Sequence, residues 1–161
     1  MGESLFSVEA EQALIGGLFV SPVSFDDVAI RVSESEFHDS KHRWTFQAMA
    51  ALNARGQPID LVTVAEELEA HGKLAEVEWA YLGTLANDTP SAANVLAYAD
   101  LVRSRARRRR LMRLGTELQQ WAQHSSAEIT LEKLATAIAA ISLGAPESAQ
   151  LMKDFLPGLI E

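Results

Sequence analysis

Residues 87–105, NDTPSAANVLAYADLVRSR, pass from a polar turn into a long amphipathic pattern that ends in arginines. From about Val95 to Gln123 the sequence has no proline and only one glycine, Gly115. At ~1.5 Å per residue such a helix is roughly 40 Å long, which is too long for a small globule. We therefore predict a helix over about 93–123 that extends away from a compact part.

The apolar side of this helix changes along its length. The early apolar residues share one direction, and the later ones lie roughly 150° away at ~100° per residue. They are Val95, Tyr98, Val102 and Ala106, then Leu111, Leu114, Leu118 and Trp121. Because one core cannot bury both sides, we expect the first half to pack on the preceding residues and the second half on another helix. The change falls at 107–110, where we expect exposure on most sides.

A second helix is predicted over about 130–143, after a polar connector at 124–129. Leu131, Leu134, Ile138 and Ile141 recur at helical spacing. Residues 93–143 then form an antiparallel helical hairpin. Two helices bury an apolar seam poorly, and exposed apolar stripes usually mark assembly. We therefore predict self-association through Leu111, Leu114, Leu118, Trp121, Leu131, Leu134, Ile138 and Ile141.

Residues 1–92 carry the start and stop signals of five or six short helices. Ser7 is the predicted N-cap of the first, which Ser21-Pro22 ends. Residues 24–32, 41–55 and 79–86 follow as helices, and 63–66 indicate a capping box. No segment alternates with period two, so the predicted fold is all-α, with a compact globular head before the hairpin. Residues 144–150 are predicted to be a linker, and 151–161 an amphipathic piece limited by Pro157.

Composition limits the class of protein. The chain has 161 residues, 48% of them hydrophobic, with no cysteine and a net charge of −8. The absence of cysteine excludes disulfides and cysteine-ligated metals. The sequence has neither a signal peptide nor an apolar run of the ~20 residues that a membrane span needs. We expect a soluble cytoplasmic protein.

Charge is distributed unevenly. Residues 103–113 hold seven arginines and no acid, which is half of the basic residues. The arginines could bind phosphates, or they could be a solvated face that meets acids of neighbouring subunits. Their spread around the helix and the acidic remainder weigh against a dedicated DNA-binding module. Both readings stay open for Arg103, Arg107, Arg108, Arg109 and Arg110.

Little in the sequence indicates catalysis. There is no G-x-x-x-x-G-K-[ST] phosphate loop, so we expect no ATP hydrolysis and no cofactor. His38, Asp39 and His42 are the only close cluster of metal-ligand types, but a metal needs further convergent ligands. The simpler interpretation is that His42 bonds to backbone or water. Trp44 and Trp79 are predicted to be core residues.

Four stretches carry a resemblance to a known family. They are VEAEQALIGGLF at 8–19, FHDSKHRWTFQAM at 37–49, GQPIDLVTVAEELEAHGKL at 56–74 and AYLGTLANDTPSAANVLAYADLVRSRARRR at 80–109. Together they span most of residues 7–110. The chain resembles the N-terminal domain of DnaB-type replicative DNA helicases, bacterial or phage.

The resemblance implies a helical head plus a hairpin that pairs with a second copy, in a trimer of dimers on a hexameric ring. It implies docking of primase and helicase loader, and single-stranded DNA encircled by the full ring. It places ATP and Mg²⁺ in an ATP-dependent 5′–3′ motor domain beyond Glu161. Residues 151–161 resemble the start of the linker helix that docks on a neighbouring motor, through Leu151, Met152, Phe155 and Leu156.

The sequence departs from the family pattern at three places. Glu78-Trp79 replace a glycine pair, and Leu5-Phe6 stand where a proline is usual. The four consecutive arginines at 107–110 exceed the usual number. These departures put the local loop geometry and the partner surface in doubt.

Overall fold

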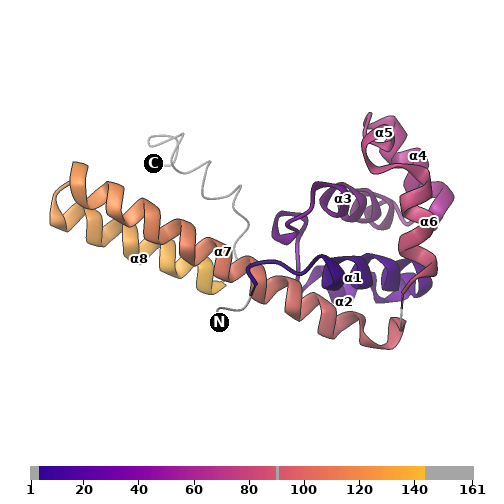
Figure 1. Ribbon diagram of the computed structural model, residues 1–161, viewed down its shortest axis with the longest axis horizontal. Helices are drawn as coiled ribbons and strands as arrows, with labels where there is room; N and C mark the ends of the chain where they lie inside the picture. The colour runs from indigo at the N-terminus through magenta and orange to yellow at the C-terminus, as the bar shows by residue number, and fades with distance from the viewer. Residues whose placement is uncertain (1–3, 90, 144–161) are drawn as a thin grey trace. The chain divides into compact units, whose positions relative to one another are not determined.

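The computed structural model describes residues 4–89 and 91–143, and these are helical with no strand among them. They form eight α-helices and three 3₁₀ turns, which confirms the all-α prediction (Figure 1). Contacts divide the chain into an N-terminal unit, residues 1–106, and a C-terminal unit, residues 107–161. The division falls inside the long helix, next to the arginines at which its apolar side changes. The predicted linker, 144–150, and linker helix, 151–161 with Leu151, Met152, Phe155 and Leu156, lie outside the described residues.

Helix α1, Val8–Val20, is the most buried helix of the N-terminal unit. Ser7 caps it as predicted, because the Ser7 hydroxyl accepts a hydrogen bond from the Ala10 N–H at 3.2 Å. Eight of its thirteen residues are buried, and Leu14, Ile15 and Leu18 are fully so. A helix that is apolar on nearly all sides belongs inside a core.

The segment after α1 is less regular than predicted. It contains η1 (Pro22–Ser24), α2 (Phe25–Ala29), η2 (Glu34–Glu36) and α3 (Ser40–Ala54). The helix expected over 24–32 is therefore shorter than predicted: it covers Phe25–Ala29 and directly follows a 3₁₀ turn. Phe37 lies in the connector, yet it is 1% exposed, with its ring centroid 5.0 Å from that of Phe46. A connector residue thus belongs to the core.

Helix α4, Leu61–Ala70, begins two residues earlier than the predicted capping box. Asp60 is the N-cap, and its carboxylate accepts from the N–H groups of Val62 and Thr63. Thr63 accepts in return from the Asp60 N–H at 3.0 Å, so it is the third helical residue of the box and not its start. The prediction was wrong because Thr63 with Glu66 matched the commoner sequence pattern.

Helices α5, Leu74–Val77, and α6, Trp79–Asn87, complete the wall of the N-terminal unit. At Gly16 a Cβ would collide with the Leu85 carbonyl and the Thr89 hydroxyl, so α1 and the end of α6 approach closely because of this glycine. Trp79 is 53% exposed, so the prediction that it lies in the core was wrong. Trp44 does pack on the core, half-buried, with the Lys73 ammonium 4.3 Å from its ring centroid.

Helix α7, Val95–His124, follows the turn η3, Ala92–Asn94, and runs for 30 residues. In the N-terminal unit it buries Val95, Ala99, Val102 and Ala106. Ala99 is buried in addition to the predicted residues, and Tyr98 is half-buried and packs against the core. Helix α8, Ala127–Leu143, starts earlier than predicted, because Ser126 caps it and leaves only two residues between the helices.

Candidate assembly surface

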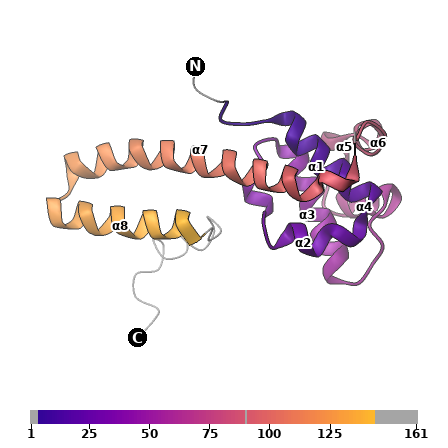
Figure 2. The same ribbon diagram turned by 90° about the horizontal axis from the view of Figure 1, so that it is seen from below.

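The C-terminal unit is the predicted hairpin, and its inner seam is narrow. Figure 2 shows α8 running back along the second half of α7. Leu114 is buried, Leu118, Trp121, Leu134 and Ile141 are half-buried, and Thr130 is 7% exposed. The Thr130 hydroxyl donates to the Ser126 carbonyl at 2.9 Å, so it enters the seam without an unsatisfied polar atom.

Three of the eight predicted seam residues lie outside this seam. Leu111, Leu131 and Ile138 are 53%, 65% and 48% exposed. The expected stripe was wrong at Leu131 and Ile138, because each lies ~80–100° around α8 from Thr130. Thr130 and Ala137 occupy the inner positions, since small side chains let the helices approach.

Leu111, Leu131 and Ile138 share one side of the hairpin, whereas the exposed Met112, Ile129 and Leu143 point in other directions. Leu111, Leu118 and Ala122 lie on α7 at ~40–80° from Leu114, on the side to which Gly115 also points. Viewed from one end of the hairpin, successive residues advance clockwise around one helix and counterclockwise around the other, because the helices are antiparallel. Leu131 and Ile138, at ~80–100° from Thr130 on α8, therefore lie on the same side of the hairpin as Leu111. We call Leu111, Gly115, Leu118, Ala122, Leu131 and Ile138 the apolar hairpin face. A Cβ at Gly115 would meet nothing within 4 Å.

The hairpin tip is fixed by local bonds. The Thr130 N–H donates to the Ser126 carbonyl at 3.0 Å, and the Ser125 N–H to the Trp121 carbonyl at 2.8 Å. The Glu128 backbone N–H and the Ser126 hydroxyl donate to the Glu128 carboxylate and hold its pKa below its usual range. On the seam, the Lys133 ammonium lies 5.5 Å from the Trp121 ring centroid.

The arginines are less exposed than predicted. Arg108 is exposed, but Arg107, Arg109 and Arg110 are half-buried, as is Arg103 in the N-terminal unit. Arg107 Nη2 donates to the Ser142 carbonyl at 3.5 Å, at the end of α8. Guanidinium nitrogens of this run are covered as well, since Arg107 Nε and Arg110 Nη1 and Nη2 are buried. The residue pattern alone does not reveal this burial.

A buried polar network links three helices of the N-terminal unit. His42 Nδ1 lies 2.8 Å from the Glu11 carboxylate, and His42 Nε2 lies 2.7 Å from the Tyr81 hydroxyl. The same carboxylate accepts from the N–H groups of His38 and Asp39. Glu11 and His42 are 2% and 0% exposed. The interpretation of His42 as bonded to backbone or water was therefore wrong.

The network satisfies itself and has no metal geometry. Among residues 4–89 and 91–143, no group of three or more histidine, cysteine or acidic side chains is placed to hold a metal ion. In the sequence, Glu11 is one of two acids in the first turn of α1, with Glu9, and nothing there distinguishes it. Nothing in one sequence tells such a surface acid from a buried one, because its partners lie 27 to 31 residues away.

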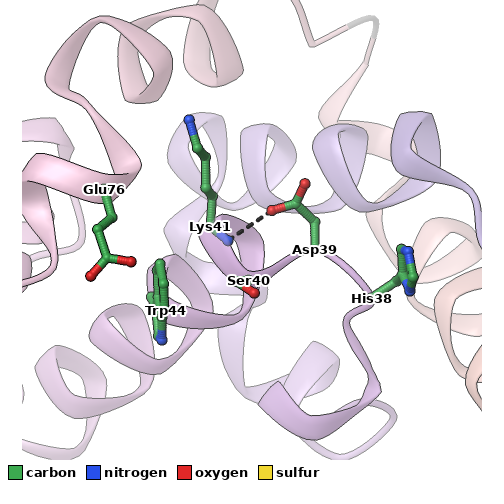
Figure 3. Close-up of a pocket in the computed structure, with 6 residues that line it drawn as sticks. All are labelled: His38, Asp39, Ser40, Lys41, Trp44 and Glu76. Atoms are coloured by element: carbon green, nitrogen blue, oxygen red, sulfur yellow. Dashed lines mark hydrogen bonds between the residues drawn. The ribbon is translucent and has the colours of Figure 1, made fainter.

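One open pocket, about 500 Å³ in volume, lies beside this network (Figure 3). Its lining residues are His38, Asp39, Ser40, Lys41, Trp44 and Glu76. Its charged groups already have partners: Asp39 accepts from the Lys41 N–H at 2.7 Å, and the Lys41 ammonium reaches Glu78 at 3.1 Å. The charged groups of Asp39 and Lys41 are thus engaged in contacts within the fold.

No helix among the described residues is long and apolar enough to cross a membrane.

Comparison with known proteins identifies the family. The family model described as DnaB-like helicase N terminal domain matches residues 3–104. The chain is 42% identical over 115 residues to the replicative DNA helicase DnaB of Haemophilus influenzae, and 38% to that of Buchnera aphidicola. Each match covers 71% of this chain and 25% of the relative, so the chain spans about a quarter of their length.

A solved structure extends the likeness beyond the family model. The crystal structure of the N-terminal domain of DnaB helicase from Mycobacterium tuberculosis matches with a TM-score of 0.78 and 31% identity. The match covers 85% of this chain and 99% of that one. The chain therefore belongs to the family of DnaB-like helicase N-terminal domains.

Proposed function

We propose that this chain is the N-terminal assembly domain of a replicative DNA helicase and pairs with a second copy of itself through the apolar hairpin face. The observation that carries this proposal is the exposure of Leu111, Leu131 and Ile138 on one side of a two-helix hairpin. Isolated apolar side chains are normal on a surface, but a row of them along a helix pair is typical of an interface.

A second copy fits this face better than an unrelated partner does. A two-fold contact brings the same patch of both chains together. Each apolar residue of the patch is therefore buried in both copies of the dimer. The row has no charged member. Gly115 leaves open space in its middle, where a facing side chain could enter.

Membership of the family supports the proposal of a larger assembly and of further partners. Three such dimers would make the collar of a hexameric ring, and the domain would dock primase and a helicase loader. The ring as a whole would encircle single-stranded DNA. ATP and Mg²⁺ would act in a motor domain encoded in the remainder of the parent protein, and the site of action would be the cytoplasm of a bacterium or of a phage-infected host.

The test is the mass of the chain in solution, by light scattering over a concentration series. We expect the parent to form dimers or larger species and Ile138→Asp to be monomeric. Full burial of an isoleucine contributes ~1.5–3 kcal/mol, and Ile138 is 48% exposed, so pairing can bury about half of that amount in each chain. The two copies together then contribute ~1.5–3 kcal/mol, and their loss raises the dissociation constant about 10- to 100-fold, before the charge of the aspartate is counted. Ala139→Asp is the matched control, because Ala139 is exposed on the outer side of α8.

Two results would overturn the proposal. One is a monomeric parent at every concentration, and the other is an Ile138→Asp variant that keeps the mass of the parent. Loss of association in Ala139→Asp alone would place the interface on the opposite side of the hairpin. Circular dichroism of each variant checks that the helices still form.

A further inference from the structure

The hairpin has a second distinctive side, the part of α7 that faces away from α8. Leu114, Leu118 and Trp121 mark the side toward α8. Within ~80° of the opposite direction, at ~100° per residue, lie one apolar side chain, Met112, which is 60% exposed, and a set of polar ones. The polar residues are Arg108, Arg109, Arg113, Thr116, Gln119, Gln120 and Gln123, and we call them the outer α7 face. All are exposed except Arg109, which is half-buried.

This face carries hydrogen-bond donors and no acid. From Arg107 to His124 the one acidic residue is Glu117, which lies ~60° from Leu114 and is half-buried on the inner flank. Sequence alone suggested arginines on all sides. The position of α8 assigns these arginines to two sides of α7. Arg107 donates to the Ser142 carbonyl at the end of α8, while Arg108, Arg109 and Arg113 lie on the side away from α8.

We propose that the outer α7 face binds the phosphate backbone of nucleic acid without reading its sequence. Arginine, glutamine and threonine are residues that contact phosphate and sugar. The face has no aromatic residue on which a base could stack, since Trp121 lies on the seam. This binding is additional to the assembly proposed above and uses a different side of the hairpin.

Existing contacts do not prevent such binding. Arg108, Arg109 and Arg113 each already make an interaction in the folded chain. A guanidinium carries five N–H donors, so it can keep one partner and also bind a phosphate oxygen. The acidic remainder of the chain repels a polyanion elsewhere and restricts it to this face.

The test is fluorescence anisotropy of a labelled oligothymidine strand, titrated with the full chain at several salt concentrations. Three phosphate contacts predict a slope of log affinity against log salt of about −2 for a single strand. A roughly tenfold rise in salt then weakens binding about 100-fold. Duplex DNA should bind with similar affinity, because only the backbone is contacted.

Matched variants locate the binding. We expect the triple change Arg108→Gln, Arg109→Gln and Arg113→Gln to lose at least about tenfold in affinity at low salt, and the three corresponding lysine changes to retain binding. Arg113→Gln alone should flatten the salt slope by about 0.7. Lys133→Gln removes one charge from α8 beside Trp121 and should leave the slope unchanged.

Absence of binding at low salt would overturn the proposal, as would a glutamine triple variant that binds like the parent. A triple variant that loses mass in solution while the parent binds no oligonucleotide would instead assign these arginines to a protein contact. Ile138→Asp separates the two proposals, because it should abolish pairing while each monomer still binds the strand.

Discussion

The two units of this chain bury their apolar residues to very different degrees. Among its described residues, the N-terminal unit has one core of 22 buried apolar residues, drawn from helices α1 to α7 and from the connectors between them. Among the described residues of the C-terminal unit, only Leu114 and Thr130 are buried. The first unit can thus fold on its own contacts, whereas the second leaves much of its apolar surface for a partner. Substitutions in the N-terminal core should therefore lower the free energy of unfolding. Substitutions on the apolar hairpin face should instead weaken association.

The largest effect is expected in the N-terminal core. Phe37→Ala removes a ring that is 1% exposed and packs on Phe46, which should lower the free energy of unfolding by ~3–5 kcal/mol. Leu131→Ala, at a side chain that is 65% exposed, should change it by less than ~0.5 kcal/mol in the monomer. Urea unfolding followed by circular dichroism measures both. Equal losses would contradict the contrast between the units.

The next effect concerns the buried network. Glu11→Ala leaves His42 and two backbone N–H groups without their acceptor, which should lower the free energy of unfolding by ~3 kcal/mol. Glu9→Ala is the control in the same helical turn, because Glu9 is exposed and should contribute less than ~1 kcal/mol. A loss at Glu11 no larger than at Glu9 would mean that the network does not hold α1, α3 and α6 together.

Features of the fold that depend on residues close in sequence could be predicted, and features that depend on distant helices could not. The Ser7 cap and the stop at Ser21-Pro22 were predicted correctly, because caps and breakers act within a few residues. Trp79 was predicted wrongly and the burial of Glu11 was not predicted, because both depend on helices distant in sequence. The hairpin was found from its periodicity, but its seam was assigned to Leu131 and Ile138 instead of Thr130 and Ala137. The spacing of apolar residues shows that a helix has an apolar side. It does not show which residues of that side contact the neighbouring helix.

A smaller effect distinguishes two glycines. Gly16→Ala forces a Cβ against the backbone carbonyl of Leu85, so we expect a loss of ~1–3 kcal/mol. Gly115→Ala meets open space within a helix and should gain up to ~1 kcal/mol in the monomeric Ile138→Asp background. Thermal unfolding compares the two. If Gly115→Ala also weakens pairing in the parent, Gly115 is a point of close approach between copies.

The smallest effect is a pH dependence within the N-terminal unit. The Arg55 guanidinium donates to the Glu67 carboxylate and holds its pKa below its usual range, with burial opposing this shift and the charges of Arg55 and His71 adding to it. A carboxyl whose pKa is lower in the folded state stabilises that state above the pKa of the unfolded chain. This stabilisation is lost as the pH falls through the folded value.

Arg55→Gln should therefore be less stable than the parent at neutral pH, and the two should converge below about pH 4. Urea unfolding at a series of pH values measures this difference. A difference that stays constant into acid would show that Arg55 acts by packing and not through the Glu67 charge.

The two-residue turn at Ser125 and Ser126 also has a kinetic consequence. Closing so short a loop costs little chain entropy, and contacts that are near in sequence form fast. The hairpin can therefore be complete before it meets another copy, so pairing is the docking of two prepared surfaces and not folding on contact. We expect an association rate constant in the range usual for protein docking, ~10⁵–10⁷ M⁻¹s⁻¹. Interface variants should differ mainly in the dissociation rate constant of the dimer.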